Sequence, residues 1–218
     1  MCVNNFKVGV IAGTPIDTEM GVDFLMSKGI DAYAYPVSSC PQEQSELQIL
    51  SPAELTNKIR DIIKNIKYEK IDKIMVYCNS LSAAVDMDRL STEENIEIIT
   101  PLHVYKNIAS KYKSIGVLAA NNKSAAGIES IVQNVNSKCN VIGIGMLPVV
   151  IDIENGVPSK EIVEKFSLKN IIEFYNSIQV DTLILGCTHL PYIYEELKKI
   201  ALVPILDPAE DMYNMICS

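Results

Sequence analysis

Two short stretches of the sequence share one pattern and together decide the fold. Residues 182–190 read TLILGCTHL, and residues 74–81 read IMVYCNSL. In each, a run of apolar residues typical of a buried strand ends at a cysteine, Cys187 or Cys78, and two polar residues and a leucine follow. We therefore expect the two cysteines to hold corresponding positions in two similar structural units.

The rest of the first half alternates between expected strands and helices. Further strands are expected over residues 6–13, 31–37 and 96–101. Thr14 as N-cap, followed by Pro15, predicts a helix that runs to about Lys28 and stops at Gly29. Residues 51–54 form a second capping signature, and a helix is also expected from about Ser80. This order predicts an α/β fold with a parallel sheet covered by helices.

The second half repeats the signals of the first at a nearly constant spacing. Four strand signals keep their order, which predicts an internal duplication into two pseudo-symmetric parallel-sheet α/β domains, residues 1–99 with 207–218 and residues 100–206. Ligands of such sheets bind beyond the carboxyl ends of the strands, so we expect the active site in the cleft between the domains. The matched positions, with their separations, are Val8 and Ile115 (107), Pro36 and Pro148 (112), Cys78 and Cys187 (109), and Pro101 and Pro208 (107).

Composition and charge limit the classes of partner. The chain has 218 residues, 48% of them hydrophobic, and a net charge of −8, which argues against nucleic acid because no basic face offsets it. No apolar run reaches the roughly 20 residues of a membrane span, and the N-terminus lacks the pattern of a signal peptide, so we expect no membrane association and a cytoplasmic location. The six cysteines contain no C-x-x-C pair, and a chain of this size needs no disulfide framework.

Two opposed thiols on either side of a substrate carbon suit one particular reaction. One cysteine, as thiolate, removes a proton, and the other, as thiol, delivers a proton to the opposite face, which inverts the stereocentre. Short polar side chains and backbone N–H groups at helix starts beside the cysteines favour a carboxylate substrate. The candidate substrate-binding residues are Gly13, Thr14, Asn79, Ser80, Thr188 and His189.

The two cysteine motifs resemble those of the aspartate/glutamate racemase family. Residues 78–80 (CNS) are similar to its first motif, and residues 185–191 (LGCTHLP) resemble its second motif in the form found in glutamate racemases. The resemblance implies an amino-acid racemase without pyridoxal phosphate or metal, in which Cys78 and Cys187 are the catalytic bases. It also implies a small acidic amino acid, glutamate or aspartate, as substrate, a homodimer, and a glutamate at Glu154 that orients His189.

One departure from the family pattern leaves the substrate and the activity open. Glutamate racemases usually carry an Asp-Ser pair after the first strand, whereas Ala12 and Gly13 stand here, a glycine-rich turn closer to that of aspartate racemases. The alternatives are a related two-cysteine isomerase, similar to maleate isomerase or hydantoin racemase, and a non-catalytic amino-acid-binding descendant of the fold.

Plainer interpretations of individual residues also stand beside these. The two cysteines could be inert core residues or a redox disulfide, and Cys187 with His189 could be metal ligands, although no further cluster supports a metal. Cys139 is expected to be a small core residue and His103 a surface or structural residue.

Overall fold

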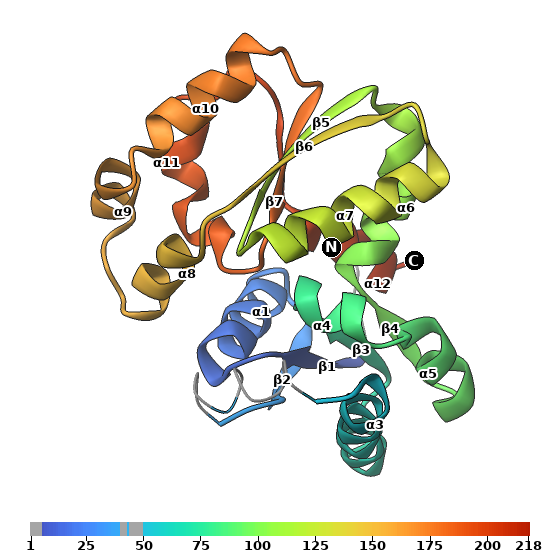
Figure 1. The fold of residues 1–218 in the computed structure, drawn as a ribbon. Coiled ribbons are helices and arrows are strands. Elements are labelled where there is room, and N and C mark those ends of the chain that lie inside the picture. The colour runs from blue at the N-terminus through green and yellow to red at the C-terminus, as the bar shows by residue number, and fades with distance from the viewer. Residues whose placement is uncertain (1–5, 40–42, 44–49) are drawn as a thin grey trace. The chain divides into compact units, whose positions relative to one another are not determined.

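The computed structural model describes residues 6–39, 43 and 50–218, which form two units (Figure 1). The first unit contains the described residues up to His103 together with Ala209–Ser218, and the second is Val104–Pro208. The sequence had placed these changes of unit after residues 99 and 206. The chain passes from the first unit to the second within helix α6 (Pro101–Ile108).

The first unit is built on a four-stranded parallel sheet in the order β2-β1-β3-β4. Its central strands are buried along most of their length, as expected for a parallel sheet with helices on its faces. The strands are β1 (Lys7–Ala12), β2 (Asp31–Pro36), β3 (Lys73–Val76) and β4 (Glu97–Ile99), and the helices are α1 (Pro15–Ser27), α3 (Pro52–Tyr68), α4 (Asn79–Ala84), α5 (Met87–Glu94) and α12 (Pro208–Ile216), whose residues from Ala209 belong to this unit.

The second unit has a four-stranded parallel sheet of the same topology, in the order β6-β5-β7-β8. The predicted fold class, two similar parallel-sheet α/β units, is therefore confirmed. The strands are β5 (Ser114–Ala119), β6 (Asn140–Gly145), β7 (Thr182–Gly186) and β8 (Ile205–Leu206), and the helices after α6 are η1 (Ala109–Lys111), α7 (Asn122–Val135), α8 (Leu147–Glu154), α9 (Ser159–Lys165), α10 (Leu168–Ser177), η2 (Leu190–Ile193) and α11 (Tyr194–Lys198).

The strand registers supply an independent test of the sequence repeat. Val8 pairs with Lys73, and Ile115, the residue matched to Val8, pairs with Thr182. This pairing relates β3 to β7 by 109 positions, the same separation that relates Cys78 to Cys187. The two cysteines therefore follow their strands at equivalent positions.

One of the four sequence matches is wrong. Pro36 lies at the end of β2 and pairs with Ala12, whereas the residue that pairs with Ala119 in the second unit is Gly145. Pro148 lies beyond the strand, inside α8, where it occupies one of the first two helical positions. The two prolines were matched by residue type alone, although one ends a strand and the other starts a helix.

Capping residues set most helix boundaries where the sequence predicted them. The Thr14 side chain accepts a hydrogen bond from Asp17 N at the start of α1, and Gly29 after the helix has φ of 81°. Ser51 and Glu54 form a complete capping box at the start of α3. The single helix expected from Ser80 is instead two, since Asp86 caps a new helix by accepting from Arg89 N.

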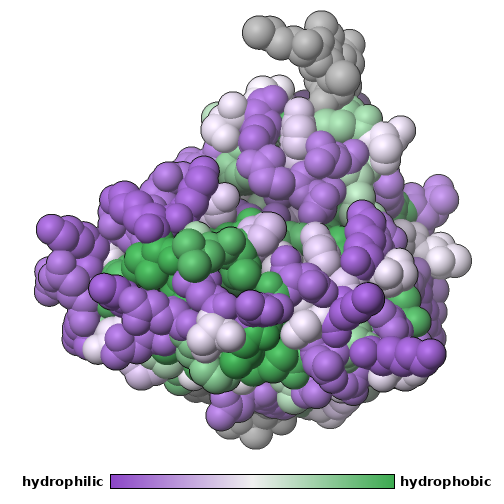
Figure 2. Space-filling view, turned by 90° about the horizontal axis from the view of Figure 1, so that it is seen from above, coloured by the Kyte–Doolittle hydropathy of each residue, from purple (hydrophilic) through white to green (hydrophobic). Residues whose placement is uncertain are grey.

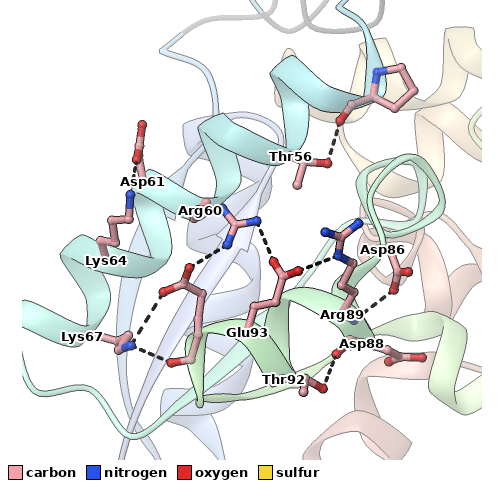
Figure 3. A network of polar contacts seen from close by, with 12 residues as sticks. Thr56, Arg60, Asp61, Lys64, Lys67, Asp86, Asp88, Arg89, Thr92 and Glu93 are labelled. Atoms are coloured by element: carbon pink, nitrogen blue, oxygen red, sulfur yellow. Dashed lines mark hydrogen bonds and ion pairs between the residues drawn. The ribbon is translucent and has the colours of Figure 1, made fainter.

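A network of ion pairs joins α3 to α5 in the first unit (Figure 3). Arg60 donates to Glu93 and Glu94, with N–O distances of 2.7 and 2.9 Å, and Arg89 also donates to Glu93 at 2.6 Å. The hydrogen bonds from Arg60 and Arg89 hold the pKa of Glu93 below its usual range. The network orients α5, which leads into β4.

The surface seen in Figure 2 is mostly polar, with apolar side chains gathered in a few patches. Exposed apolar residues of this kind are ordinary in globular proteins and do not by themselves mark a binding surface. In the part of the chain that the structure describes, no helix combines the length and the apolar character needed to cross a membrane.

Candidate active site

Cys78 lies at the carboxyl end of β3, buried, as the N-cap residue of α4. Tyr77 N donates to Ile11 O at 2.7 Å, which extends the β1–β3 pairing to the residue before the cysteine. The thiol Sγ lies 3.4 Å from Ser80 Oγ, and either atom can be the donor. Asn79, in the first turn of α4, is also buried.

Gly13 and Thr14 lie at the carboxyl end of β1, the strand next to β3, so the first unit brings its predicted site residues to one edge of the sheet. Both Thr14 and Asp17 are buried. The Asp17 carboxylate accepts a hydrogen bond from Gly13 N at 3.3 Å, and the Ser38 hydroxyl donates to Gly13 O at 2.6 Å. These contacts fix the backbone of the turn. Cys2 and Cys40 lie outside the described residues.

Cys187 lies at the carboxyl end of β7 with its thiol Sγ 3.6 Å from His189 Nδ1. Nε2 on the other side of the imidazole is 3.1 Å from Oε1 of Glu154, the last residue of α8. A carboxylate accepts hydrogen bonds, so the contact with Glu154 places the neutral ring's proton on Nε2 and leaves Nδ1 to accept from the thiol. Cys187, His189 and Glu154 thus form a chain along which charge on the thiol can be balanced.

The backbone after Cys187 differs from the sequence-based expectation. Thr188 and His189 were expected at a helix start, but they form a turn, and η2 begins only at Leu190. The turn brings the His189 ring back over Cys187, two residues earlier, whereas the helix after Cys78 holds Ser80 near the thiol instead. Thr188 and His189 are both buried.

The surroundings of the two cysteines, each within its own unit, are related but chemically different. By the strand registers, Ser80 corresponds to His189 and Thr14 corresponds to Asn121. Asn121 caps α7 by accepting from Ser124 N, as Thr14 caps α1. The sequence-based site omitted Asn121, although its separation from Thr14, equal to that between Val8 and Ile115, is a signal that could have found it.

The other candidate residues have structural surroundings. Cys139 is buried, and burial raises the pKa of its thiol, so it has the properties of an inert core cysteine. His103 Nδ1 accepts from Thr100 N at the start of α6, and Nε2 lies 2.6 Å from Asp88 Oδ1, which gives it a capping role. Among the residues that the structure describes, no group of three or more His, Cys, Asp or Glu side chains is arranged to hold a metal ion.

Comparison with curated proteins finds glutamate racemases. The sequence is 29% identical over 152 residues to glutamate racemase of Clostridium botulinum and 30% identical over 168 residues to that of Fusobacterium nucleatum. These matches cover 66% and 73% of this chain, and 58% and 60% of the relatives. The matched region therefore spans about three fifths of the length of these relatives. No family model matches the sequence.

Solved structures with this fold come from the same group of proteins. Glutamate racemase from Francisella tularensis, solved in complex with D-glutamate, has a TM-score of 0.75 at 23% identity, over 98% of this chain and 80% of that one. Aspartate racemase from Picrophilus torridus has a TM-score of 0.70 at 19% identity, over 97% and 93% of the two chains. In sequence and in fold this chain therefore resembles the aspartate/glutamate racemase family. Its two strand-end cysteines and the His189–Glu154 contact are accordingly the residues to consider for the chemistry of such a racemase.

Proposed function

We propose that this protein is a cofactor-independent racemase that interconverts the L and D forms of an acidic amino acid, with Cys78 and Cys187 as its two bases. One observation supports the proposal: by the strand registers the two cysteines have equivalent positions, each at the carboxyl end of a buried parallel strand. A duplicated fold with a thiol at the equivalent position of each unit suits a reaction in which one cysteine is the base and the other is the acid.

The proposed reaction moves one proton in and one proton out. A thiolate at one cysteine removes the α-proton of the substrate and becomes a thiol, and the electron pair of the C–H bond remains on the substrate as a carbanion-like intermediate. The thiol of the other cysteine then gives its proton to the opposite face of the α-carbon and becomes a thiolate. The reverse reaction exchanges the two roles.

The residues around the cysteines have separate proposed roles. The imidazole of His189, held by Glu154, balances charge on Cys187, and Ser80 does so more weakly for Cys78 through its hydroxyl. The remaining candidates offer backbone N–H groups and short polar side chains for the substrate carboxylates and for the charge of the intermediate. They are Gly13, Thr14, Asn79 and Thr188.

Glutamate is the first substrate to test, with aspartate second. The curated relatives named above are glutamate racemases, and one of the similar structures was solved with D-glutamate. Another similar structure is an aspartate racemase, at nearly the same TM-score. The Glu154–His189 contact supports glutamate, since the family resemblance assigns this carboxylate to glutamate racemases.

The test is incubation of the purified protein with each enantiomer of glutamate and aspartate in deuterated water, with the α-proton followed by NMR. We expect loss of the α-proton signal and formation of the opposite enantiomer, detected by chiral chromatography, for at least one of the two amino acids. Folded protein that exchanges no α-proton in any of the four samples would show that the racemase proposal is wrong.

One observation favours the alternative of a non-catalytic amino-acid-binding protein. Ala12 ends β1 at the position where glutamate racemases usually carry an aspartate. In that case calorimetry would detect binding of glutamate or aspartate in samples where NMR detects no exchange. Exchange or isomerisation of maleate or of a hydantoin, without action on either amino acid, would instead assign a related isomerase.

The resemblance also led us to expect a homodimer, which we retain as part of the proposal. Light scattering of the purified chain measures its mass in solution directly. A mass near twice the 24.1 kDa of one chain is the expected result.

A further inference from the structure

The last turn of α8 contains two carboxylates, Asp152 and Glu154, although carbonyl groups at the C-terminal end of a helix disfavour negative charge. Each carboxylate has a partner that can be positively charged. Asp152 Oδ2 lies 2.6 Å from Lys165 Nζ, and Glu154 Oε1 lies 3.1 Å from His189 Nε2. Both pairs therefore start from the same helical turn, and the Glu154–His189 pair belongs to the candidate site.

The Asp152–Lys165 pair is partly withdrawn from solvent. The Asp152 side chain is 12% exposed and that of Lys165, the last residue of α9, is 53% exposed. The Lys165 ammonium also lies 5.1 Å from the centre of the Phe166 ring. Ion pairs of this kind add little net stability, because desolvation offsets the attraction, but they fix the geometry of the elements that they join.

The backbone after Glu154 is held in a defined turn. Gly156 has φ of 71°, its N–H donates to Ile153 O, and Val157 N donates to Asp152 O, both at 3.0 Å. These are the two hydrogen bonds of a Schellman motif, which ends α8. One of them is accepted by the backbone carbonyl of Asp152, the residue whose side chain pairs with Lys165. Asp152 and Glu154 therefore belong to one hydrogen-bonded turn, so the contact of Asp152 with Lys165 also bears on the position of Glu154.

We propose that Asp152 and Lys165 are positioning residues that hold α8 so that Glu154 stays against His189, and that Lys165 offsets the effect of the Asp152 charge on His189. This proposal rests on the proposed function for its kinetic consequences, but its structural part is independent of the activity. Neither residue is assigned contact with the substrate.

The other charged groups of α9 and α10 face solvent. On α9, Lys160 and Glu164 approach each other at 4.0 Å with side chains 79% and 69% exposed, and Glu161 is exposed. On α10, Lys169 and Glu173 form an exposed pair at 3.7 Å. Among these charged groups, Lys165 is the one that forms an ion pair with the last turn of α8. Lys169→Met, which removes an exposed lysine from α10, is the matched control.

The test is an NMR titration of the two histidines of the chain in the variants Lys165→Met and Asp152→Asn. Removal of the positive charge leaves Asp152 uncompensated, so the midpoint of His189 should rise by about 0.5 pH unit. Removal of the carboxylate should lower it by about the same amount. The double variant should return close to the wild-type midpoint, and His103, in the other unit, should stay unchanged in all samples as an internal reference.

Kinetics and a conservative variant complete the test. We expect Lys165→Met to lower kcat about fivefold with KM within about twofold, and Lys165→Arg and Lys169→Met to keep wild-type kcat. His189 midpoints that move in the same direction in both single variants, or do not move, would overturn the proposal even if activity falls. Midpoints that move in opposite directions in a protein without racemase activity would support the pair and show that the proposed function is wrong.

Discussion

Glu154 and His189 make the two candidate catalytic cysteines unequal. The thiol of Cys187 lies 3.6 Å from an imidazole that contacts a carboxylate, whereas the thiol of Cys78 lies 3.4 Å from a hydroxyl. An imidazolium can balance a neighbouring thiolate, and a hydroxyl can only donate a hydrogen bond to it. Inequality of this kind gives the two directions of a racemase different kcat and KM values, while the two kcat/KM values stay equal because the equilibrium constant between enantiomers is one.

The substitution Glu154→Gln tests the contacts that link Cys187, His189 and Glu154, called the relay below. Glutamine keeps the size and can keep a hydrogen bond to His189 but removes the negative charge that stabilises an imidazolium. We expect kcat/KM to fall about tenfold or more, measured by circular dichroism of the racemised amino acid. Glu164→Gln, on the exposed face of α9, is the control and should have no effect. Equal losses in both variants would contradict the relay.

Individual residues were predicted where the sequence contains a motif, and not where a contact depends on folding. Cys78, Cys187 and the residues beside them stand in motifs that can be read directly. Lys165 could not be found in this way, because its contact with Asp152 spans two helices and a turn, and neither residue lies in a recognisable pattern. The bend that brings His189 back to Cys187 was also missed, since the motif resembles a helix start.

At the scale of elements, the helix and the strand that pack together near each cysteine pair one large residue with one glycine. The glycine is on the helix in the first unit and on the strand in the second. In the first unit Gly21 of α1 lies under the Tyr77 ring, the residue before Cys78, and a Cβ at Gly21 would lie 2.9 Å from that ring. In the second unit the corresponding helix position is Ile128, and the residue before the cysteine is Gly186. Each unit thus pairs one large residue with one glycine, which explains how both keep a close strand–helix approach with different residues.

The substitution Gly21→Ala tests this packing. The added methyl group would press on Tyr77 and on Val10, at 2.8 Å, so we expect a loss of about 1–3 kcal/mol in the free energy of unfolding and lower activity through the shift of Cys78. Gly127→Ala in α7 is the control, because nothing lies within 4 Å of its Cβ, and it should stabilise by about 0.5–1 kcal/mol. Urea unfolding measures both. A stabilised Gly21→Ala variant would contradict the packing argument.

A second element-scale feature repeats in both sheets. The Asp181 carboxylate before β7 accepts hydrogen bonds from Lys113 N and Ser114 N at the start of β5, at 2.6 and 2.9 Å. Asp72 before β3 accepts from Lys7 N in the same way, at 2.8 Å. Each carboxylate ties the first strand of its unit to the third, so the starts of the strands are aligned by side chains as well as by the ladder.

The pH dependence of stability follows from Asp181. The backbone hydrogen bonds from Lys113 and Ser114 hold the pKa of this carboxyl below its usual range, so its contribution is fully present above about pH 4 and is lost as the pH falls through the lowered value. We expect Asp181→Asn to lower the melting temperature by about 2 °C at neutral pH, with a smaller difference at pH 3. Thermal scans across this range measure it, and a difference that grows on acidification would have the wrong sign.

At the scale of the whole chain, the duplication was the most informative prediction. The alternation of strands and helices and the spacing of 107 to 109 positions predicted two sheets of one topology, and the registers give both sheets that topology. The spacing carries this information because corresponding strand–helix segments of the two units have nearly the same length. The match between Pro36 and Pro148 failed because it rested on residue type: the registers match Pro36 to Gly145, and Pro148 lies further along the chain, in α8.

The claim that two equivalent cysteines are the two bases is tested most directly by Cys78→Ser and Cys187→Ser, with Cys139→Ala as the control for loss of a buried thiol. Interconversion of glutamate or aspartate enantiomers is followed in deuterated water for each variant. Because a serine hydroxyl is a far weaker base than a thiolate, each of the two variants should lose at least about a thousandfold in rate, while Cys139→Ala keeps the wild-type rate. A wild-type rate in either Cys78→Ser or Cys187→Ser would contradict the account.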